Sequence, residues 1–177
     1  DALAHNVGTI RRSLAPGVRF YAVCKNNAYG CGARETSRVM LEAGADAFAV
    51  ADPEDAQRIR NAGIDAPILL YACTTPEAAA SVAQLGLIAT VHDFQGLEAY
   101  AGIGRAVDVH VEVDCGYGRL GFLPHEWTRA FAQLRKARNL RVVGVYTHLS
   151  AVEDRDVGAG QARLFASAQA HAGEAGL

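Results

Sequence analysis

Residues 20–32 read FYAVCKNNAYGCG, so that an apolar run leads into a lysine and then into a turn with two glycines. A short apolar run bounded by turn residues is typical of a buried strand. We therefore predict a strand over residues 19–25 with Lys25 at its C-terminal end. An amine can form an imine with a carbonyl cofactor, whereas the guanidinium of the far commoner arginines cannot. The alternative is an ordinary strand-end lysine with its head in water.

The same change from a short apolar run to a helical pattern recurs along the chain. Further strands are expected at residues 47–51, 67–72, 87–92, 107–114 and 140–148. Helices are expected at residues 1–14, 33–43, 52–63, 94–101, 125–138 and 158–172, with another beginning at Pro76. Strands that alternate with helices over short connections predict an α/β fold, in which helices cover a parallel sheet.

The six strand–helix units are two fewer than a (β/α)8 barrel needs, and 177 residues fall short of its usual ~250. Two interpretations are open: a doubly wound open sheet, or an incomplete TIM-type barrel that is a piece of a larger protein. We favour the incomplete barrel, with residues 1–177 as its N-terminal domain, because the polar residues suit a barrel active site better than a nucleotide crevice. The chain ends at Leu177, where a seventh strand is expected to begin.

The composition argues against several classes of function. The net charge is −2, so we expect no nucleic-acid partner. No apolar run approaches the ~18 residues of a membrane span, and the first residues lack a signal peptide. We therefore expect no membrane partner and a cytoplasmic location. The cysteines are widely spaced, which indicates free thiols in a reducing compartment; they are Cys24, Cys31, Cys73 and Cys115. Cys24 and Cys73 are expected to be small buried apolar side chains.

In a barrel, catalytic groups gather at the C-terminal ends of the strands. The polar residues expected at such positions are Lys25, Tyr29, Glu112, Asp114, Arg119 and His148. Each also has an ordinary structural explanation, such as a solvated strand face, a surface ion pair or a histidine bonded within the core. Their joint placement at one rim favours a shared site.

The expected strand 107–114 departs from the apolar pattern of a buried strand, because four polar residues alternate with four valines. The polar residues are Asp108, His110, Glu112 and Asp114. Successive side chains of a strand point to opposite faces. We therefore expect the valines to pack under helices and the polar side chains to point into the barrel, with Glu112 and Asp114 nearest the rim.

Two other kinds of site have little support in the sequence. Residues 116–121, GYGRLG, fit the GxGxxG pattern of dinucleotide-binding proteins. The acid that should bind the ribose about 20 residues later is missing, because no Asp or Glu lies between Glu126 and Glu153. The histidines on the expected strands, His92, His110 and His148, lack the paired spacing of a zinc site. We therefore expect no metal.

Three blocks of the sequence resemble the alanine racemases, which are pyridoxal-phosphate enzymes with a barrel domain. Residues 22–32, AVCKNNAYGCG, resemble the cofactor-lysine motif AVVKANAYGHG. Residues 113–122, VDCGYGRLGF, resemble VDTGMGRLGF, and residues 144–150, GVYTHLS, followed by Asp154, resemble the GxxTHFA…D block. The first block is highly specific, and the order and spacing of all three fit across nearly the whole chain.

The resemblance implies a cofactor, an activity and a role for each residue. Lys25 would form the internal Schiff base with pyridoxal 5′-phosphate and act as the base on one face of the substrate. Tyr29 would lie near the cofactor phosphate, and His148 would lie against the pyridine ring. Arg119 would contact the phenolic oxygen of the cofactor and the substrate carboxylate. The implied activity is the interconversion of L- and D-alanine.

Some residues depart from the family pattern. The family often has a lysine, sometimes carbamylated, at the position of Glu112. Our hypothesis is that the Glu112 carboxylate supplies that negative charge directly and fixes Arg119, with Asp114 as a second supporting charge. Tyr117 stands where the family usually has methionine, so a serine or broad-specificity racemase remains open.

The resemblance also implies parts of the enzyme outside these residues. In the family, the second base is a tyrosine from a C-terminal β domain of the partner subunit, which implies a homodimer for the full-length protein. Tyr100 and Tyr146 do not match its motif. We expect the 177-residue polypeptide alone to be inactive and to hold the cofactor weakly.

Two functions from outside the racemases also remain open. One is a non-catalytic pyridoxal-phosphate carrier on a similar barrel, whose lysine motif is usually KTK-like, unlike the residues that follow Lys25. The second is a related decarboxylase, against which the Tyr29 and Arg119 blocks argue.

Overall fold

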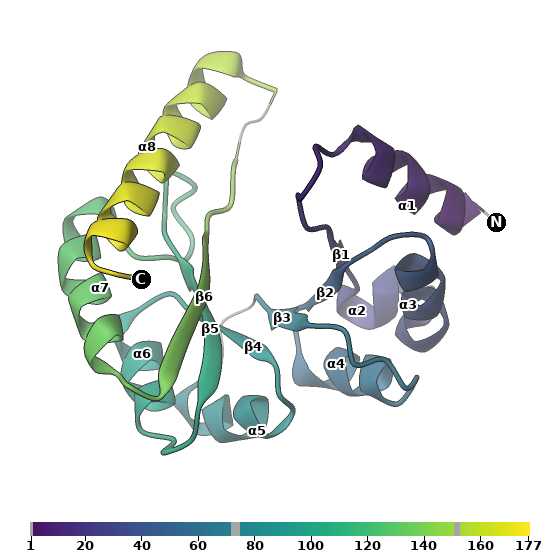
Figure 1. The fold of residues 1–177 in the computed structure, drawn as a ribbon, viewed down its shortest axis with the longest axis horizontal. Coiled ribbons are helices and arrows are strands. Elements are labelled where there is room, and N and C mark those ends of the chain that lie inside the picture. Colours follow the sequence, from purple (N-terminus) through teal and green to yellow (C-terminus); the bar gives the residue numbers. More distant parts are fainter. Residues whose placement is uncertain (1, 72–74, 151–152) are drawn as a thin grey trace. The chain divides into compact units, whose positions relative to one another are not determined.

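The computed structural model describes residues 2–71, 75–150 and 153–177. Six strands follow one another in one sheet in sequence order (Figure 1). They are β1 (Tyr21–Val23), β2 (Ala47–Val50), β3 (Ile68–Leu70), β4 (Ile88–Val91), β5 (Val107–Glu112) and β6 (Leu140–Tyr146). A doubly wound sheet reverses its strand order and places the first strand inside the sheet, whereas β1 ends this strand order. The predicted α/β fold with six strand–helix units is therefore confirmed, and the doubly wound alternative is wrong.

Helices follow the strands. In the part of the chain that the structure describes, the α-helices are α1 (Ala2–Ser13), α2 (Lys25–Tyr29), α3 (Ala33–Glu42), α4 (Pro53–Arg60), α5 (Ala79–Gln84), α6 (Phe94–Ala101), α7 (Trp127–Lys136) and α8 (Arg155–Glu174). Helix α4 begins as predicted, because the Asp52 side chain accepts a hydrogen bond from the Asp55 backbone N–H at 2.8 Å and Pro53 occupies the first helical position. None of the described helices is long and apolar enough to cross a membrane.

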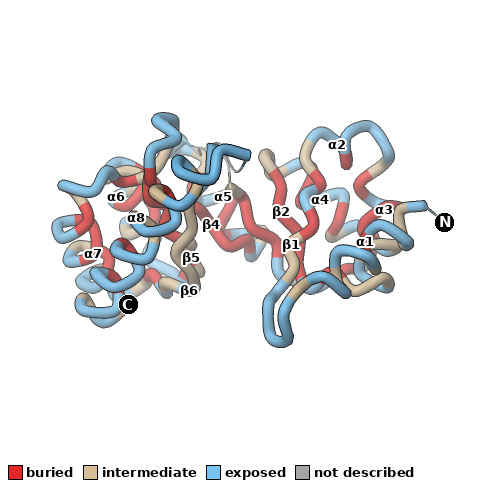
Figure 2. Tube along the Cα trace, turned by 90° about the horizontal axis from the view of Figure 1, so that it is seen from above, coloured by how far each residue is buried: buried red, intermediate tan, exposed pale blue. Residues whose placement is uncertain are grey.

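The chain divides into two compact units, Asp1–Ala72 with Gln84–Ile88 and Cys73–Ala83 with Ala89–Leu177. In the first unit, β2 pairs in parallel with β1 on one side and with β3 on the other. A small apolar cluster in this unit consists of Ala49, Leu69 and Ile88, with Tyr21 and Tyr71 packed against it. The strands β2 and β4 are buried along their whole length, as Figure 2 shows in red.

In the second unit, β5 pairs in parallel with β4 and with β6. The register shifts in the second pair: Val109 lies opposite Val142, and His110 lies opposite Gly144, so Val143 is the extra residue of a β-bulge. A Cβ atom at Gly144 would lie 2.7 Å from His110 Nε2. A larger residue here would require the imidazole to move, because the His110 ring lies directly over the backbone of the neighbouring strand.

The alternation along β5 separates two kinds of side chain, as predicted. The valines at odd positions are at most 3% exposed; they are Val107, Val109, Val111 and Val113. Glu112 and Asp114 are also buried, at 2% and 7% exposure, so a solvated strand face does not explain these two carboxylates. Asp108 forms an ion pair with Arg141 at 2.5 Å, and that arginine is largely exposed, so the pair contributes little to stability.

Some predicted boundaries are wrong. The strand expected over residues 19–25 ends at Val23, and Lys25 instead opens the short helix α2. The strand expected over residues 107–114 ends at Glu112, and Val113 forms only an isolated bridge with Phe122. The helix expected over residues 125–138 is divided into a 3₁₀ turn and α7. The prediction for Cys73 lies outside the described residues.

Candidate active site

Lys25 is followed by a turn with left-handed backbone geometry. The four residues after it have φ angles between 51° and 56°; they are Asn26, Asn27, Ala28 and Tyr29. None of them is glycine. Asparagine tolerates a left-handed helical conformation better than most residues, but the conformation costs Ala28 and Tyr29 roughly 1–2 kcal/mol each. Strained backbone of this kind persists only where the surrounding structure enforces it, and it is concentrated at functional sites.

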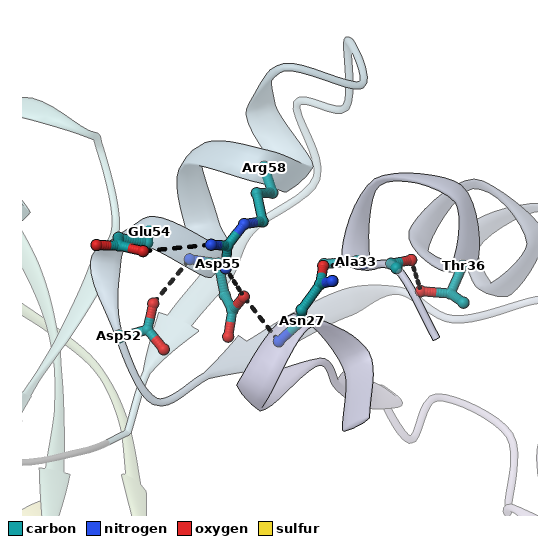
Figure 3. Close-up of polar contacts among 8 residues, drawn as sticks. Asn27, Ala33, Thr36, Asp52, Glu54, Asp55 and Arg58 are labelled. Carbon is teal, nitrogen blue, oxygen red and sulfur yellow. Dashed lines mark hydrogen bonds and ion pairs between the residues drawn. The ribbon is translucent and has the colours of Figure 1, made fainter. Parts of the chain in front are cut away.

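Asp55 on α4 is the main contact that enforces this turn (Figure 3). Its carboxylate is fully buried. Its Oδ1 atom accepts hydrogen bonds from the Asn27 backbone N–H at 2.9 Å and from the Arg58 guanidinium at 2.6 Å. The Asn27 side chain in turn accepts from the backbone N–H of Ala33, the first residue of α3, at 2.8 Å. The turn that carries Lys25 is thus fixed to two helices.

The Lys25 side chain is half-buried, and its Nζ lies 5.8 Å from the centre of the Tyr29 ring. Among the residues that the structure describes, no carboxylate lies within 4.0 Å of this amine. Tyr29 itself is 63% exposed. The amine is therefore not held in an ion pair with any described residue.

The neighbouring thiol of Cys24 does not compete with this amine as a nucleophile. Burial, with a smaller contribution from the Asp55 charge, raises the pKa of Cys24 to about 11. Its Sγ contacts the Met40 Sδ at 3.8 Å. A neutral, enclosed thiol is unreactive, so Cys24 is the small buried side chain that the sequence predicts. Cys31 is exposed, and Cys115 is buried.

In the second unit, Asp114 shapes the loop that carries Arg119. Its Oδ1 accepts hydrogen bonds from the backbone N–H groups of Gly116, Tyr117 and Gly118 at 2.8, 2.9 and 3.2 Å. Its Oδ2 accepts a further one from Gly118 at 3.0 Å. A carboxylate that accepts several N–H groups fixes the backbone of a tight loop. Asp114 thus acts on the backbone of this loop.

Two predicted site residues meet around the Tyr117 ring. The guanidinium carbon of Arg119 lies 4.7 Å from the centre of this ring, in a cation–π arrangement. The His148 imidazole meets the same ring edge to face, with 4.5 Å between the centroids. His148 is exposed, so a core histidine does not explain it. Arg119 forms no ion pair within 4.0 Å with any described residue, so a surface ion pair does not explain it either. Arg119 and His148 are therefore brought together through Tyr117.

Glu112 lies in a buried polar network on the strands of the same unit. Its Oε2 accepts a hydrogen bond from the Tyr146 hydroxyl at 3.1 Å, and the Thr90 hydroxyl lies 3.1 Å from the same phenol oxygen. Burial raises the pKa of Glu112, although the hydrogen bond from Tyr146 and the charge of Arg119 oppose this shift. Burial and the Glu112 charge also raise the pKa of Tyr146. In the described residues, no ion pair within 4.0 Å joins Glu112 to Arg119.

The predicted residues thus fall into two groups. Lys25 and Tyr29 lie together in the first unit, and Glu112, Asp114, Arg119 and His148 lie in the second. No group of three or more His, Cys, Asp or Glu residues in the described ranges could hold a metal ion. Four residues that are fixed to a site residue or its loop were not predicted from the sequence; they are Asn27, Asp55, Tyr146 and Gln161. For Asp55 and Gln161 the signal would have been burial on a helix, which is not visible in the sequence.

Comparison with known proteins identifies the family. The family described as alanine racemase, N-terminal domain, matches residues 1–177. The alanine racemase of Desulforamulus reducens is 38% identical over 161 residues, which are 88% of this chain and 44% of that protein. The alanine racemase of Acidithiobacillus ferrooxidans is 38% identical over 178 residues, which are 97% of this chain and 48% of that protein.

Solved structures give the same result. The crystal structure of alanine racemase from Corynebacterium glutamicum matches with a TM-score of 0.92 and 30% identity, over 100% of this chain and 52% of that one. The structure of alanine racemase from Bacillus anthracis with bound L-Ala-P matches with a TM-score of 0.92 and 29% identity, over 100% of this chain and 47% of that one. The chain spans about half the length of these relatives, and its six strands match their N-terminal barrel portion, which confirms the predicted incomplete barrel. The chain belongs to the alanine racemase family and corresponds to its N-terminal domain.

Proposed function

We propose that this chain is the lysine-bearing domain of a pyridoxal-phosphate-dependent racemase that interconverts L- and D-alanine. The observation that carries the proposal is the Lys25 amine, which follows β1 in a strained turn and has no carboxylate within 4.0 Å among the described residues. A primary amine that must react with an aldehyde needs this freedom, because an ion pair would hold it protonated.

The chemistry of the side chains fits such a cofactor. Lys25 would bond to the cofactor aldehyde, and the exposed Tyr29 hydroxyl would be open to its phosphate. The planar groups of Arg119 and His148 would lie against its ring and oxygen atoms. When bound, pyridoxal phosphate supplies an electron sink that makes the Cα–H of an amino acid acidic. Lys25 would then move the proton at that carbon, while the fork of Arg119 binds the carboxylate.

Racemisation needs a base on each face of the substrate, and Lys25 serves only one face. Tyr146 does not suit the other face, because its hydroxyl is bound to Glu112 and Thr90 and its pKa is raised. We propose that the second base belongs to a longer, homodimeric, cytoplasmic protein and that residues 1–177 alone are inactive and bind the cofactor weakly. The length of the relatives, about twice that of this chain, supports this proposal.

The function is tested with the full-length gene product. L-Alanine should be converted to D-alanine in a pyridoxal-phosphate-dependent reaction, followed by chiral chromatography. Tyr117, whose partly exposed ring adjoins Arg119, favours comparison with bulkier or polar substrates, so L-serine and L-lysine belong in the same experiment. Cofactor binding without any D-amino acid would instead indicate a non-catalytic carrier.

We propose that the Glu112 charge acts on Arg119 through space rather than through an ion pair. Glu112→Gln in the full-length protein should raise the KM for alanine about tenfold, because the guanidinium loses the opposing charge of a buried carboxylate. The KM and kcat of both proteins measure this effect. An unchanged KM would contradict the proposed charge.

Glu112→Gln should also change the pH dependence of stability. It should weaken substrate binding but reduce the loss of stability at higher pH. Because the pKa of Glu112 is raised in the folded state, its contribution to stability is present below its ordinary pKa and is lost as the pH rises through the raised value. The amide of the Glu112→Gln variant stays neutral, so the variant should lose less stability than the parent above about pH 4.3. Thermal unfolding as a function of pH therefore separates a charge needed for binding from a residue needed for folding.

A further inference from the structure

Gln161 is a buried amide on the outer helix α8, at only 5% exposure. Its Oε1 accepts a hydrogen bond from the Ser150 backbone N–H at 3.1 Å, and its Nε2 donates one to the Ser150 hydroxyl at 2.9 Å. Glutamine is mostly exposed on helices unless a buried partner satisfies it. Both polar atoms of this side chain thus form hydrogen bonds with one loop residue, Ser150.

That loop carries His148. Ser150 lies two residues after His148, and residues 147–150 belong to no helix or strand. The imidazole of His148 makes the edge-to-face contact with Tyr117 at 4.5 Å. A loop without backbone ladder bonds takes its position from side-chain contacts, so the two bonds from Gln161 help to place the imidazole.

Gln161 also adjoins the loop that carries Arg119. A Cβ atom at Gly116 would lie 3.6 Å from Gln161 Nε2, which is ordinary van der Waals contact. Gly116 is the first of the loop residues held by Asp114. One side chain from α8 therefore lies against both loops, the one with Tyr117 and Arg119 and the one with His148.

We propose that Gln161 is a positioning residue that holds the His148 loop against the Tyr117–Arg119 loop. It touches neither His148 nor Arg119 directly, and it acts on them through Ser150 and Gly116. A shift of either loop would misplace a planar group that must lie against a planar ligand, and misplacement by about 1 Å can reduce a rate about 10²-fold. This inference rests on the proposed function for the identity of that ligand.

The test uses three single substitutions in the full-length protein. Gln161→Met keeps the length and the packing of the side chain but removes both hydrogen bonds. Ser150→Ala removes only the bond to the hydroxyl, at an exposed position, and serves if the first variant does not fold. Gln169→Met is the matched control, because Gln169 is an exposed glutamine on the same helix.

Hydrogen–deuterium exchange measured without cofactor is the first readout. Gln161→Met should speed amide exchange in residues 114–119 and 147–150 about tenfold, while Gln169→Met leaves both segments unchanged. The second readout is the dissociation constant for pyridoxal phosphate, from an absorbance titration, which should rise about tenfold in Gln161→Met and less in Ser150→Ala. Adding Ser150→Ala to Gln161→Met should change little more, because both remove the same contact.

The inference would be overturned if both loops of Gln161→Met exchanged at the parent's rate. If Gln161→Met does not fold, the same result in Ser150→Ala would overturn it. So would faster exchange confined to α8, or equal effects of Gln161→Met and Gln169→Met. The outcomes also separate this inference from the proposed function. Faster exchange in both loops of a protein that binds no pyridoxal phosphate would support the positioning role and refute the cofactor. Unchanged exchange in an active racemase would support the proposed function and refute the positioning role.

Discussion

Replacing Lys25 with arginine in the full-length protein is expected to abolish racemisation, with kcat lower by about 10³-fold or more. Arginine keeps the positive charge and much of the length of the side chain, so the turn after β1 and its contact with Tyr29 should survive. A guanidinium neither condenses with an aldehyde nor accepts a proton near neutral pH. Chiral chromatography of alanine and a titration with pyridoxal phosphate measure the two losses.

The chain provides its own control for this experiment. Lys136, the last residue of α7, is exposed and is the only other lysine in the sequence. Lys136→Arg should leave both activity and cofactor binding unchanged. Borohydride treatment in the presence of pyridoxal phosphate should label Lys25 in the parent, and mass spectrometry of the peptides locates the label. A label on Lys136, or an active Lys25→Arg variant, would refute the proposed role of Lys25.

The order of strands and helices could be predicted from the sequence because it depends on local patterns. The valines of β5 alternate with polar residues, and the cap of α4 consists of Asp52 and Pro53. Such features depend on residues that are neighbours in the chain, so that period and capping chemistry are sufficient to identify them. The site residues of the racemase motifs could be found for a different reason, since their types and spacing match a known family.

The left-handed turn after Lys25 could not be predicted in this way. Asn26, Asn27 and Ala28 have no intrinsic preference strong enough to hold four consecutive left-handed residues. The conformation depends on Asp55, which lies 28 residues further along the chain and bonds to the Asn27 backbone at 2.9 Å. Local propensity cannot reveal a bond of this range, and the predicted strand was therefore extended too far.

The support of the second group of site residues was missed for the same reason. Tyr146 reaches Glu112 over 34 positions of sequence, and Gln161 reaches Ser150 over 11 positions. Neither tyrosine nor glutamine is distinctive at these places in the sequence. The Glu112 hypothesis is changed by this contact, since the carboxylate accepts a hydrogen bond from Tyr146 and forms no ion pair within 4.0 Å with Arg119 among the described residues.

Gly121→Ala should destabilise the fold strongly. A Cβ atom at Gly121 would lie 2.6 Å from the Asp114 backbone nitrogen and 2.7 Å from the Val113 carbonyl carbon, and its φ of +112° excludes ordinary side chains. The clash would separate Phe122 from the end of β5, where Asp114 N–H donates to the Phe122 carbonyl at 3.0 Å. Overpacking and backbone strain together should lower the free energy of unfolding by roughly 3–5 kcal/mol, which urea denaturation can measure.

Gly118→Ala is the control that separates the two effects expected at Gly121, the close contact with the Asp114 backbone and the strain of a positive φ. Gly118 lies in the same loop and also has a positive φ, +77°, but a Cβ atom there would meet nothing within 4 Å. Its replacement should therefore cost only about 1 kcal/mol, the usual penalty for a left-handed alanine. Equal losses in the two variants would show that backbone strain alone, and not the contact with Asp114, makes glycine necessary at position 121. A larger loss at Gly121 means that the segment that closes the Arg119 loop is held against β5 by close backbone contact.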